Sequence, residues 1–216
     1  MYLPKIFEES RLDVLHRLIR THPFGTLVIA SGGELDANHV PFLMVPDAGP
    51  FGTLQAHVSR SNPVWEHLDG PLEALAIFQG PDAYVTPSWY PSKRLDGKVV
   101  PTWNYAVVHA YGKPRAIEEP AWLEEHVTRL TAQQESRQLH PWQVSDAPAG
   151  FVERMISRIV GIEIPVARIH GKWKVNQNRK LADTLGVAAG LQSQATEKSR
   201  ALAQLVLERA REASSE

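Results

Sequence analysis

Short β-rich segments at regular spacing are the feature that most constrains how this chain can fold. Glycine, proline, asparagine and aspartate separate them, as at Gly32-Gly33 and Gly80-Pro81-Asp82. Short strands joined by short turns are typical of an antiparallel barrel or sandwich. The segments are Thr26–Ser31, Ala37–Val45, Thr53–Ser59, Leu72–Gln79, Ala83–Thr86 and Thr102–Ala110.

Helical periodicity flanks these segments. A capping pattern at Ser10 and Asp13 opens a predicted helix that runs to Thr21. Further helices are predicted over 120–134 and 148–160, with Gly161 ending the second, and from Asn178 onward, where Leu202, Leu205 and Val206 form an apolar stripe. Between them Glu163–Val175 is predicted as a strand interrupted at Gly171. The pattern indicates one α+β domain over residues 1–191 and a C-terminal helical extension over 192–216.

Composition narrows the class of protein. The chain has 216 residues, 43% of them hydrophobic, and no cysteine, which excludes disulfides and thiolate metal sites. No apolar run is long enough to span a bilayer, and the first residues lack the pattern of a secretory signal. We therefore expect a cytoplasmic protein without a membrane partner. The net charge of −1 argues against direct DNA binding unless a local basic patch supplies it.

Several catalytic motifs are absent from the sequence. It contains no G-x-G-x-x-G, Walker-type phosphate loop, H-E-x-x-H or G-x-S-x-G, which disfavours dinucleotide folds, nucleotide hydrolases, zinc proteases and common esterases. The nine histidines lack metal-ligand spacing, so no metal site is predicted. No catalytic residue can be identified from these patterns.

Three segments combine aromatic, polar and cationic residues: 56–63, 87–105 and 168–180. The last contains five Lys or Arg and no acid, although the whole chain is nearly neutral. Flavin mononucleotide (FMN) needs this combination, because its ring stacks on aromatics, its carbonyl edge accepts hydrogen bonds and its phosphate attracts cations. Single-stranded nucleic acid would use similar groups. Alternatively, Trp89, Trp103 and Trp173 pack in the core and the lysines extend to solvent.

Ordered motifs across most of the chain resemble the PaiB family of FMN-binding negative transcriptional regulators. They run from Met1-Tyr2-x-Pro4-x-x-Phe7 through Pro23-Phe24-x-Thr26-Leu27, Asn38-His39-x-Pro41-Phe42, His57-Val58-x-Arg60-x-Asn62-Pro63, Phe78-x-Gly80-Pro81-x-Ala83-Tyr84, Pro87-Ser88-Trp89-Tyr90-x-x-Lys93, Val100-Pro101-Thr102-Trp103-Asn104-Tyr105, Pro141-Trp142, Asp146-Ala147-Pro148 and Gly171-Lys172-Trp173-Lys174 to Gln177-Asn178. The sequence departs from the family where Asn176 replaces a common serine and where Ser59 and Ser61 replace the usual alanines.

The resemblance implies an antiparallel split β-barrel, the FMN-binding fold of flavin reductases and pyridoxamine-phosphate (PNP) oxidases, with flanking helices. It also implies FMN as cofactor and a homodimer, because two subunits of this fold usually complete each flavin site. The family's regulatory role implies a repressor whose further partner is DNA or another protein.

The expected cofactor-binding residues come from the three polar-aromatic segments. Arg60, Ser88 and Lys93 are the phosphate candidates, and Thr102 and Asn104 the hydrogen-bonding candidates. The remaining candidates are Trp89, Tyr90 and Trp103 around the ring, with Lys174, Gln177 and Asn178 reaching the ligand from the later strand, in the same subunit or its partner.

Three functions from different classes stay open at this point. The first is an FMN-binding repressor that senses flavin or redox state. The alternative is a flavin-dependent oxidoreductase without direct DNA binding, including a variant that binds haem through His39, His57 or His109. The third is a non-catalytic scaffold whose last helix recruits another protein.

Overall fold

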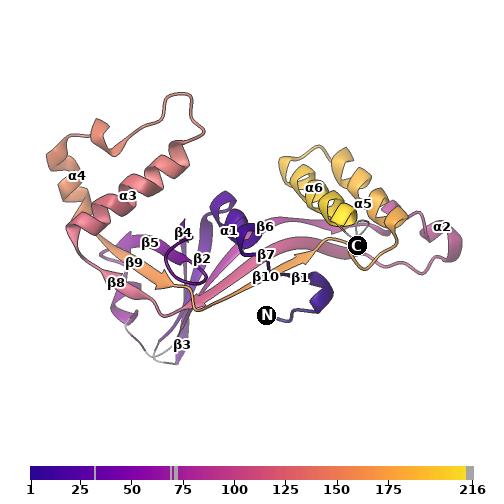
Figure 1. Cartoon of the computed structure of the whole chain (residues 1–216), viewed down its shortest axis with the longest axis horizontal. Helices are drawn as coiled ribbons and strands as arrows, with labels where there is room; N and C mark the ends of the chain where they lie inside the picture. Colours follow the sequence, from indigo (N-terminus) through magenta and orange to yellow (C-terminus); the bar gives the residue numbers. More distant parts are fainter. Residues whose placement is uncertain (32, 69, 71–72, 213–216) are drawn as a thin grey trace. The chain divides into compact units, whose positions relative to one another are not determined.

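The chain forms two compact units. Residues 1–31, 33–68, 70 and 73–212 are described by the computed structural model (Figure 1). Unit 1 comprises Met1–Arg11, Gln79–Val108 and His170–Glu216, and unit 2 comprises Leu12–Phe78 and His109–Ile169. Each unit is described separately below.

A three-strand segment of unit 2 follows the order β6-β2-β3. β2 (Phe24–Ser31) pairs antiparallel along its whole length with β3 (Glu34–Pro41), and with β6 (Ala74–Val85) over Leu75–Ile77. Phe42 is fully buried and follows β3 directly. The predicted segment 37–45 is therefore divided into the end of β3 and a short β4 (Leu43–Val45).

The second sheet of unit 2 follows the order β4-β5-β9-β8. β5 (Thr53–Ser59) pairs with β9 (Ile159–Pro165), which also pairs with β8 (Arg115–Ile117). Helix α3 (Pro120–Glu135) places the Trp122 ring so close to Gly161 that a Cβ there would lie 2.4 Å from it. The other helices of unit 2 are α1 (Leu12–Thr21), η2 (Pro63–His67), η4 (Val144–Asp146) and α4 (Ala149–Ile156).

Unit 1 has strands in the order β1-β10-β7-β6. They are β1 (Glu8–Glu9), β10 (Arg168–Lys174), β7 (Thr102–Gly112) and the end of β6. Figure 1 shows α5 (Leu181–Ser193) and α6 (Glu197–Glu212) packed together on one side of these strands. Leu191, Leu202 and Val206 are fully buried there, because each lies on the apolar stripe of its helix. The short elements are η1 (Lys5–Phe7), η3 (Pro87–Trp89) and α2 (Lys93–Asp96).

Ion pairs join the N-terminal strand β1 and the residue Arg11 to the helix α6 in unit 1. The carboxylate of Glu9 on β1 is almost completely buried and contacts Arg11 and Arg209, the latter on α6. Arg11 also pairs with Glu212 at 2.8 Å. Burial alone raises the pKa of Glu9, but the hydrogen bonds from Arg11 and the charge of Arg209 hold that pKa below its usual value. Because it is paired, the buried charge is tolerated.

The α+β class and the antiparallel sheets are confirmed, although neither sheet closes into a barrel in the described part of the chain. Three predicted details are wrong. Gly80-Pro81-Asp82 lies inside β6 rather than in a turn, and the helix predicted to reach residue 160 ends at Ile156. The strand predicted over Glu163–Val175 is divided between β9 and β10 at Val166-Ala167, whereas Gly171, the predicted interruption, lies inside β10. The predicted domain boundary after residue 191 falls within α5.

The extension predicted over 192–216 contains the end of α5 and all of α6. Its residues 213–216, like Gly32 and Leu72 of the predicted turns and strands, lie outside the described residues. No helix of the described ranges is long and apolar enough to cross a membrane.

Candidate functional site

All the predicted cofactor-binding residues except Arg60 belong to unit 1. They lie in three places: at the paired ends of β7 and β10, in the turn after β10, and in the segment around η3 and α2. Ninety residues of sequence separate Ser88, in the segment around η3, from Asn178, in the turn after β10.

Lysines and aromatic rings gather at the ends of β7 and β10. Alternation places Asn104 and Trp173, which are buried, on the faces opposite to those of their strand neighbours Trp103, Lys172 and Lys174. Of these neighbours Lys172 is also buried, Lys174 is partly buried and Trp103 is exposed. Trp103 is 55% exposed and meets Tyr84, 46% exposed, edge to face with centroids 6.2 Å apart.

Contacts between the lysines and β7 complete this group. The Lys174 ammonium donates to the Trp103 carbonyl at 2.8 Å and to the Thr102 hydroxyl. The Lys172 ammonium lies 5.6 Å from the centroid of the Tyr105 ring and donates to the Tyr2 carbonyl at 3.0 Å. We call Tyr84, Trp103, Tyr105, Lys172 and Lys174 the cation–aromatic cluster.

The positive charge of this cluster has no acidic partner. Among the described residues no salt bridge includes Lys172 or Lys174. Burial lowers the pKa of the Lys174 ammonium; Tyr105 raises this pKa, and the nearby charges of Lys172 and Arg179 lower it further. A bound anion would offset both the burial and the repulsion, so the cluster is suited to a phosphate.

A turn with one buried amide, Asn176, and one partly buried amide, Gln177, follows β10. Asn176 has a φ of 69°, which asparagine adopts more readily than most residues, and it is almost completely buried. Its Oδ1 accepts a hydrogen bond from Asn104, whereas its Nδ2 has no partner in the described structure. Gln177 donates to the Trp173 carbonyl and accepts from the backbone of Val175 at 2.8 Å, so its amide closes the turn.

The segment around η3 packs on α5. A Cβ at Gly190 would lie 2.2 Å from the Trp89 ring, so this glycine is what lets the indole approach the helix. Tyr90 is buried, and the Arg179 guanidinium lies 5.3 Å from its ring centroid. Lys93 donates to Ser88 at 3.4 Å. Trp89 and Tyr90 are thus largely packing residues, and their contact with a flavin stays a prediction.

The Arg60 guanidinium forms an ion pair and two hydrogen bonds within unit 2. It pairs with Glu118 at 2.6 Å and donates to the carbonyls of Ser157 at 3.2 Å and Ile159 at 3.3 Å. These contacts tie the end of β5 to β9 and the segment before it. Its role as a phosphate contact, like that of the exposed Asn178, stays a prediction.

Sequence reasoning missed four residues of the site: Tyr84, Tyr105, Lys172 and Arg179. The signal for Lys172 was present, because the alternation Lys172-Trp173-Lys174 places both lysines on one face of a strand. The contacts of Tyr84 and Tyr105 depend on strand register, which the sequence does not specify.

The histidines considered as haem ligands have different surroundings. His57 Nδ1 lies 3.0 Å from His126 Nε2, and Trp122 stacks on the His126 ring with centroids 5.2 Å apart. Burial lowers the pKa of His57; burial, His57 and Arg129 together lower the pKa of His126 to about 3. His39 lies on β3 and His109 on β7. In the described ranges, no three His, Asp or Glu side chains gather as a metal site.

Comparison with known proteins identifies the family. The family described as "Putative FMN-binding domain" matches residues 1–168. Protease synthase and sporulation protein PAI 2 of Bacillus subtilis is 30% identical over 95% of this chain and 96% of its own length. The chain belongs to the PaiB family of FMN-binding proteins. An uncharacterized protein of Emericella nidulans is 34% identical to this chain over 97% of both chains.

The PaiB fold is also found in solved structures. The flavocytochrome Anf3 of Azotobacter vinelandii superposes with a TM-score of 0.55 at 12% identity, over 77% of this chain and 69% of its own. This likeness establishes the split-barrel fold, which confirms the predicted fold class. FMN is the cofactor of the family.

The residues of unit 1 fit FMN. The Lys174 ammonium beside the Thr102 hydroxyl has no carboxylate partner among the described residues and suits a phosphate, and the exposed Trp103 ring suits an isoalloxazine. The buried Nδ2 of Asn176 is a donor without a partner in the described structure, and such a group usually has one in the functional state.

Proposed function

We propose that this PaiB-family chain is a cytoplasmic, homodimeric repressor that binds FMN at the cation–aromatic cluster of unit 1. The observation that carries the proposal is the uncompensated charge of Lys174 beside a hydroxyl and an exposed indole ring. The name of the Bacillus subtilis relative, a sporulation protein, supports the regulatory part.

Each group of the cofactor has a candidate partner in unit 1. Lys174 and Thr102 would hold the phosphate, with Lys172 and Arg179 strengthening the local positive potential. Trp103 and Tyr84 would contact the ring, and Asn176 Nδ2 would donate to its carbonyl edge. When bound, FMN supplies reversible uptake of electrons, and the residues named here bind and orient it.

Exposed apolar side chains support the homodimer. Besides Tyr84 and Trp103, unit 1 exposes Leu95 on α2 (81%) and Val100 between α2 and β7 (62%). Apolar side chains gathered in one region are typical of protein–protein interfaces, and a second copy would remove them from water. The net charge of −1 favours a protein rather than DNA as the partner through which repression acts.

Titration of the purified protein with FMN tests the binding part. We expect Lys174→Ala to weaken FMN roughly 10- to 100-fold, because one charge-assisted phosphate contact contributes about 1.5–3 kcal/mol. Lys113→Ala, which removes an exposed lysine of unit 2, is the matched control and should leave the affinity unchanged. Equal affinities for all three proteins would exclude the proposed phosphate contact.

The regulatory part needs a separate experiment. A purified protein that retains FMN, has twice the mass of one chain by light scattering and lowers transcription from a target promoter in a flavin-dependent manner would support the repressor. Rapid NADPH oxidation with no effect on transcription would instead favour the oxidoreductase.

A further inference from the structure

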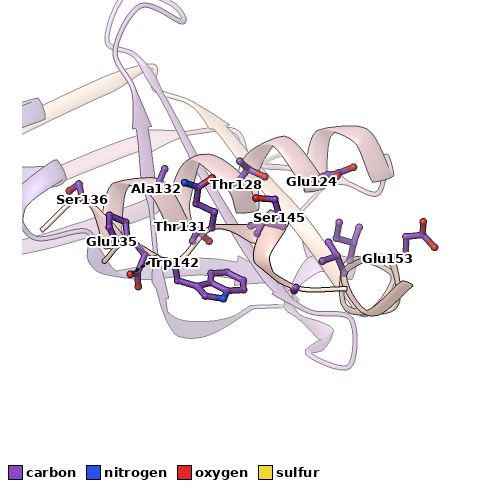
Figure 2. Close-up of a pocket in the computed structure, with 15 residues that line it drawn as sticks. Glu124, Thr128, Thr131, Ala132, Glu135, Ser136, Trp142, Ser145 and Glu153 are labelled. Carbon is purple, nitrogen blue, oxygen red and sulfur yellow. Dashed lines mark hydrogen bonds between the residues drawn. The ribbon is translucent and has the colours of Figure 1, made fainter. Parts of the chain in front are cut away.

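A pocket in unit 2 has no part in the proposed FMN site. Helix α3, the loop that contains η4, and helix α4 surround a cavity of about 770 Å³ (Figure 2). This volume lies within the range of pockets that hold small organic ligands. All its lining residues belong to unit 2, whereas the cation–aromatic cluster belongs to unit 1.

The lining combines apolar walls with acidic groups. Ala132, Val144, Val152 and Ile156 are among the apolar residues, and Trp142 contributes an indole that is 46% exposed. The carboxylates come from Glu124, Glu135 and Glu153, and none of the described lining residues is Lys, Arg or His. Because the chain as a whole has 23 basic and 24 acidic residues, a pocket with three acids and no base is a marked local imbalance.

The aromatic wall of the pocket is held in place by backbone contacts. The Trp142 backbone N–H donates to a carboxylate oxygen of Glu135 at 3.1 Å. The next residue, Gln143, donates from its backbone to Asp146 at 2.8 Å, which fixes the start of η4. In Figure 2 the Trp142 ring lies along one side of the pocket, with Glu135 beside it and Glu124 and Glu153 toward the other end.

Glu124 and Glu153, whose carboxylates also line the pocket, have no cationic partner in the described structure. No salt bridge within the described ranges includes Glu124 or Glu153, whereas the neighbouring Glu125 pairs with Arg129 at 3.6 Å. Their negative charge would repel the phosphate of FMN and attract a cation. An indole face also attracts cations, most strongly where water is excluded.

We propose that this pocket binds a small organic cation, a protonated amine or quaternary ammonium with an apolar body. The apolar walls would bury the body of the ligand, the Trp142 ring would lie against it, and the carboxylates would compensate its charge. The proposal does not depend on FMN binding, because the two sets of residues lie in different units.

Calorimetric titration of the full chain with 2-phenylethylammonium tests the proposal, with 2-phenylethanol as the uncharged match. We expect the ammonium to bind at least tenfold more tightly than the alcohol, and FMN to leave its affinity unchanged. Absence of binding, or equal affinity of the two compounds, would overturn the proposal.

Two variants locate the binding. We expect Trp142→Ala and the double change Glu124→Gln with Glu153→Gln each to weaken the ammonium roughly tenfold, whereas Glu125→Gln on the same helix should have no effect. Thermal unfolding checks that each variant folds. If a second copy of the chain covers this pocket instead, Trp142→Ala will weaken self-association in sedimentation and the wild-type chain will not bind the ammonium, which would overturn the proposal.

Discussion

Two groups of polar residues, one in each unit, differ in the partners they have. In unit 2, His57 contacts the Nε2 of His126, and Glu163 accepts from Gln55 at 3.0 Å and from Arg115, although the His126 Nδ1 has no hydrogen-bond partner in the described structure. In unit 1, Lys174 has no carboxylate partner and Asn176 Nδ2 no hydrogen-bond partner in the described structure. Satisfied buried groups stabilise a fold, whereas unsatisfied ones are typical of a site that acquires its partner from a ligand.

The largest effect that tests this contrast is expected at His126. Changing it to Ala removes a ring packed on Trp122 and leaves His57 without its buried partner, so the free energy of unfolding should fall by about 3 kcal/mol. Urea denaturation measures this, and His140→Ala, at an exposed position of unit 2, should change it by less than about 0.5 kcal/mol. Similar losses of unfolding free energy for His126→Ala and His140→Ala would show that the buried His57–His126 pair does not stabilise the fold more than an exposed histidine does.

Acid should destabilise the chain through the same pair. The pKa values of His57 and His126 are lowered in the folded chain, so both are neutral there while the unfolded chain takes up protons below about pH 6.5. Stability is then greatest above that pH and falls as the pH decreases toward 3, with a loss of about 2 kcal/mol by pH 5. The free energy of unfolding, measured by urea denaturation between pH 5 and 7, should fall as the pH decreases. The fall should be smaller in the His126→Gln variant.

Asn176 allows a smaller test in unit 1. The backbone at Asn176 has a φ of 69°. We expect Asn176→Ser to lower the free energy of unfolding by about 1 kcal/mol, because serine tolerates this region less well than asparagine. Asn176→Gly removes the hydrogen bond to Asn104 but accepts the backbone conformation without strain. The difference between the two variants therefore separates the contribution of backbone strain from that of the hydrogen bond.

Lys174 should show the smallest effect on folding. Replacing it with Met keeps the length of the side chain and removes a partly buried charge that has no acidic partner, so the free energy of unfolding should change by less than about 0.5 kcal/mol. FMN affinity should nevertheless fall as for Lys174→Ala. A large loss of stability would instead show that the Lys174 ammonium stabilises the fold, as the paired groups His57–His126 and Glu163–Arg115 of unit 2 are expected to do.

Local patterns predicted much of the fold. The strand over Thr53–Ser59 matches β5 residue for residue, and α1 begins two residues after the predicted capping serine. The failures involve long-range pairing. Residues 159–160 fit a helical stripe, yet the segment from Ile159 forms β9 because β5 pairs with it along its full length. Pro81 is tolerated in β6 because it lies beyond the Leu75–Ile77 stretch that pairs with β2.

Local sequence patterns predicted only part of the candidate site. The acid-poor window over 168–180 predicted positive charge around Lys174, and Lys172 and Arg179 lie close enough to lower its pKa. The role of Lys174 in cofactor binding stays a prediction. Whether a polar residue is satisfied depends on contacts made after folding. Gln177 closes its own turn and Trp89 packs on Gly190, and neither outcome has a signal in the sequence.

The contact of Arg11 and Arg209 with Glu9 makes the beginning and the end of the chain interdependent. β1 pairs Glu8 with Lys172, so whatever detaches the last helix also loosens the strand beside the cluster lysines. Fusion tags or truncations at the carboxyl end would therefore perturb the strand that carries Lys172 and Lys174, and an amino-terminal tag would do so through the same ion pairs.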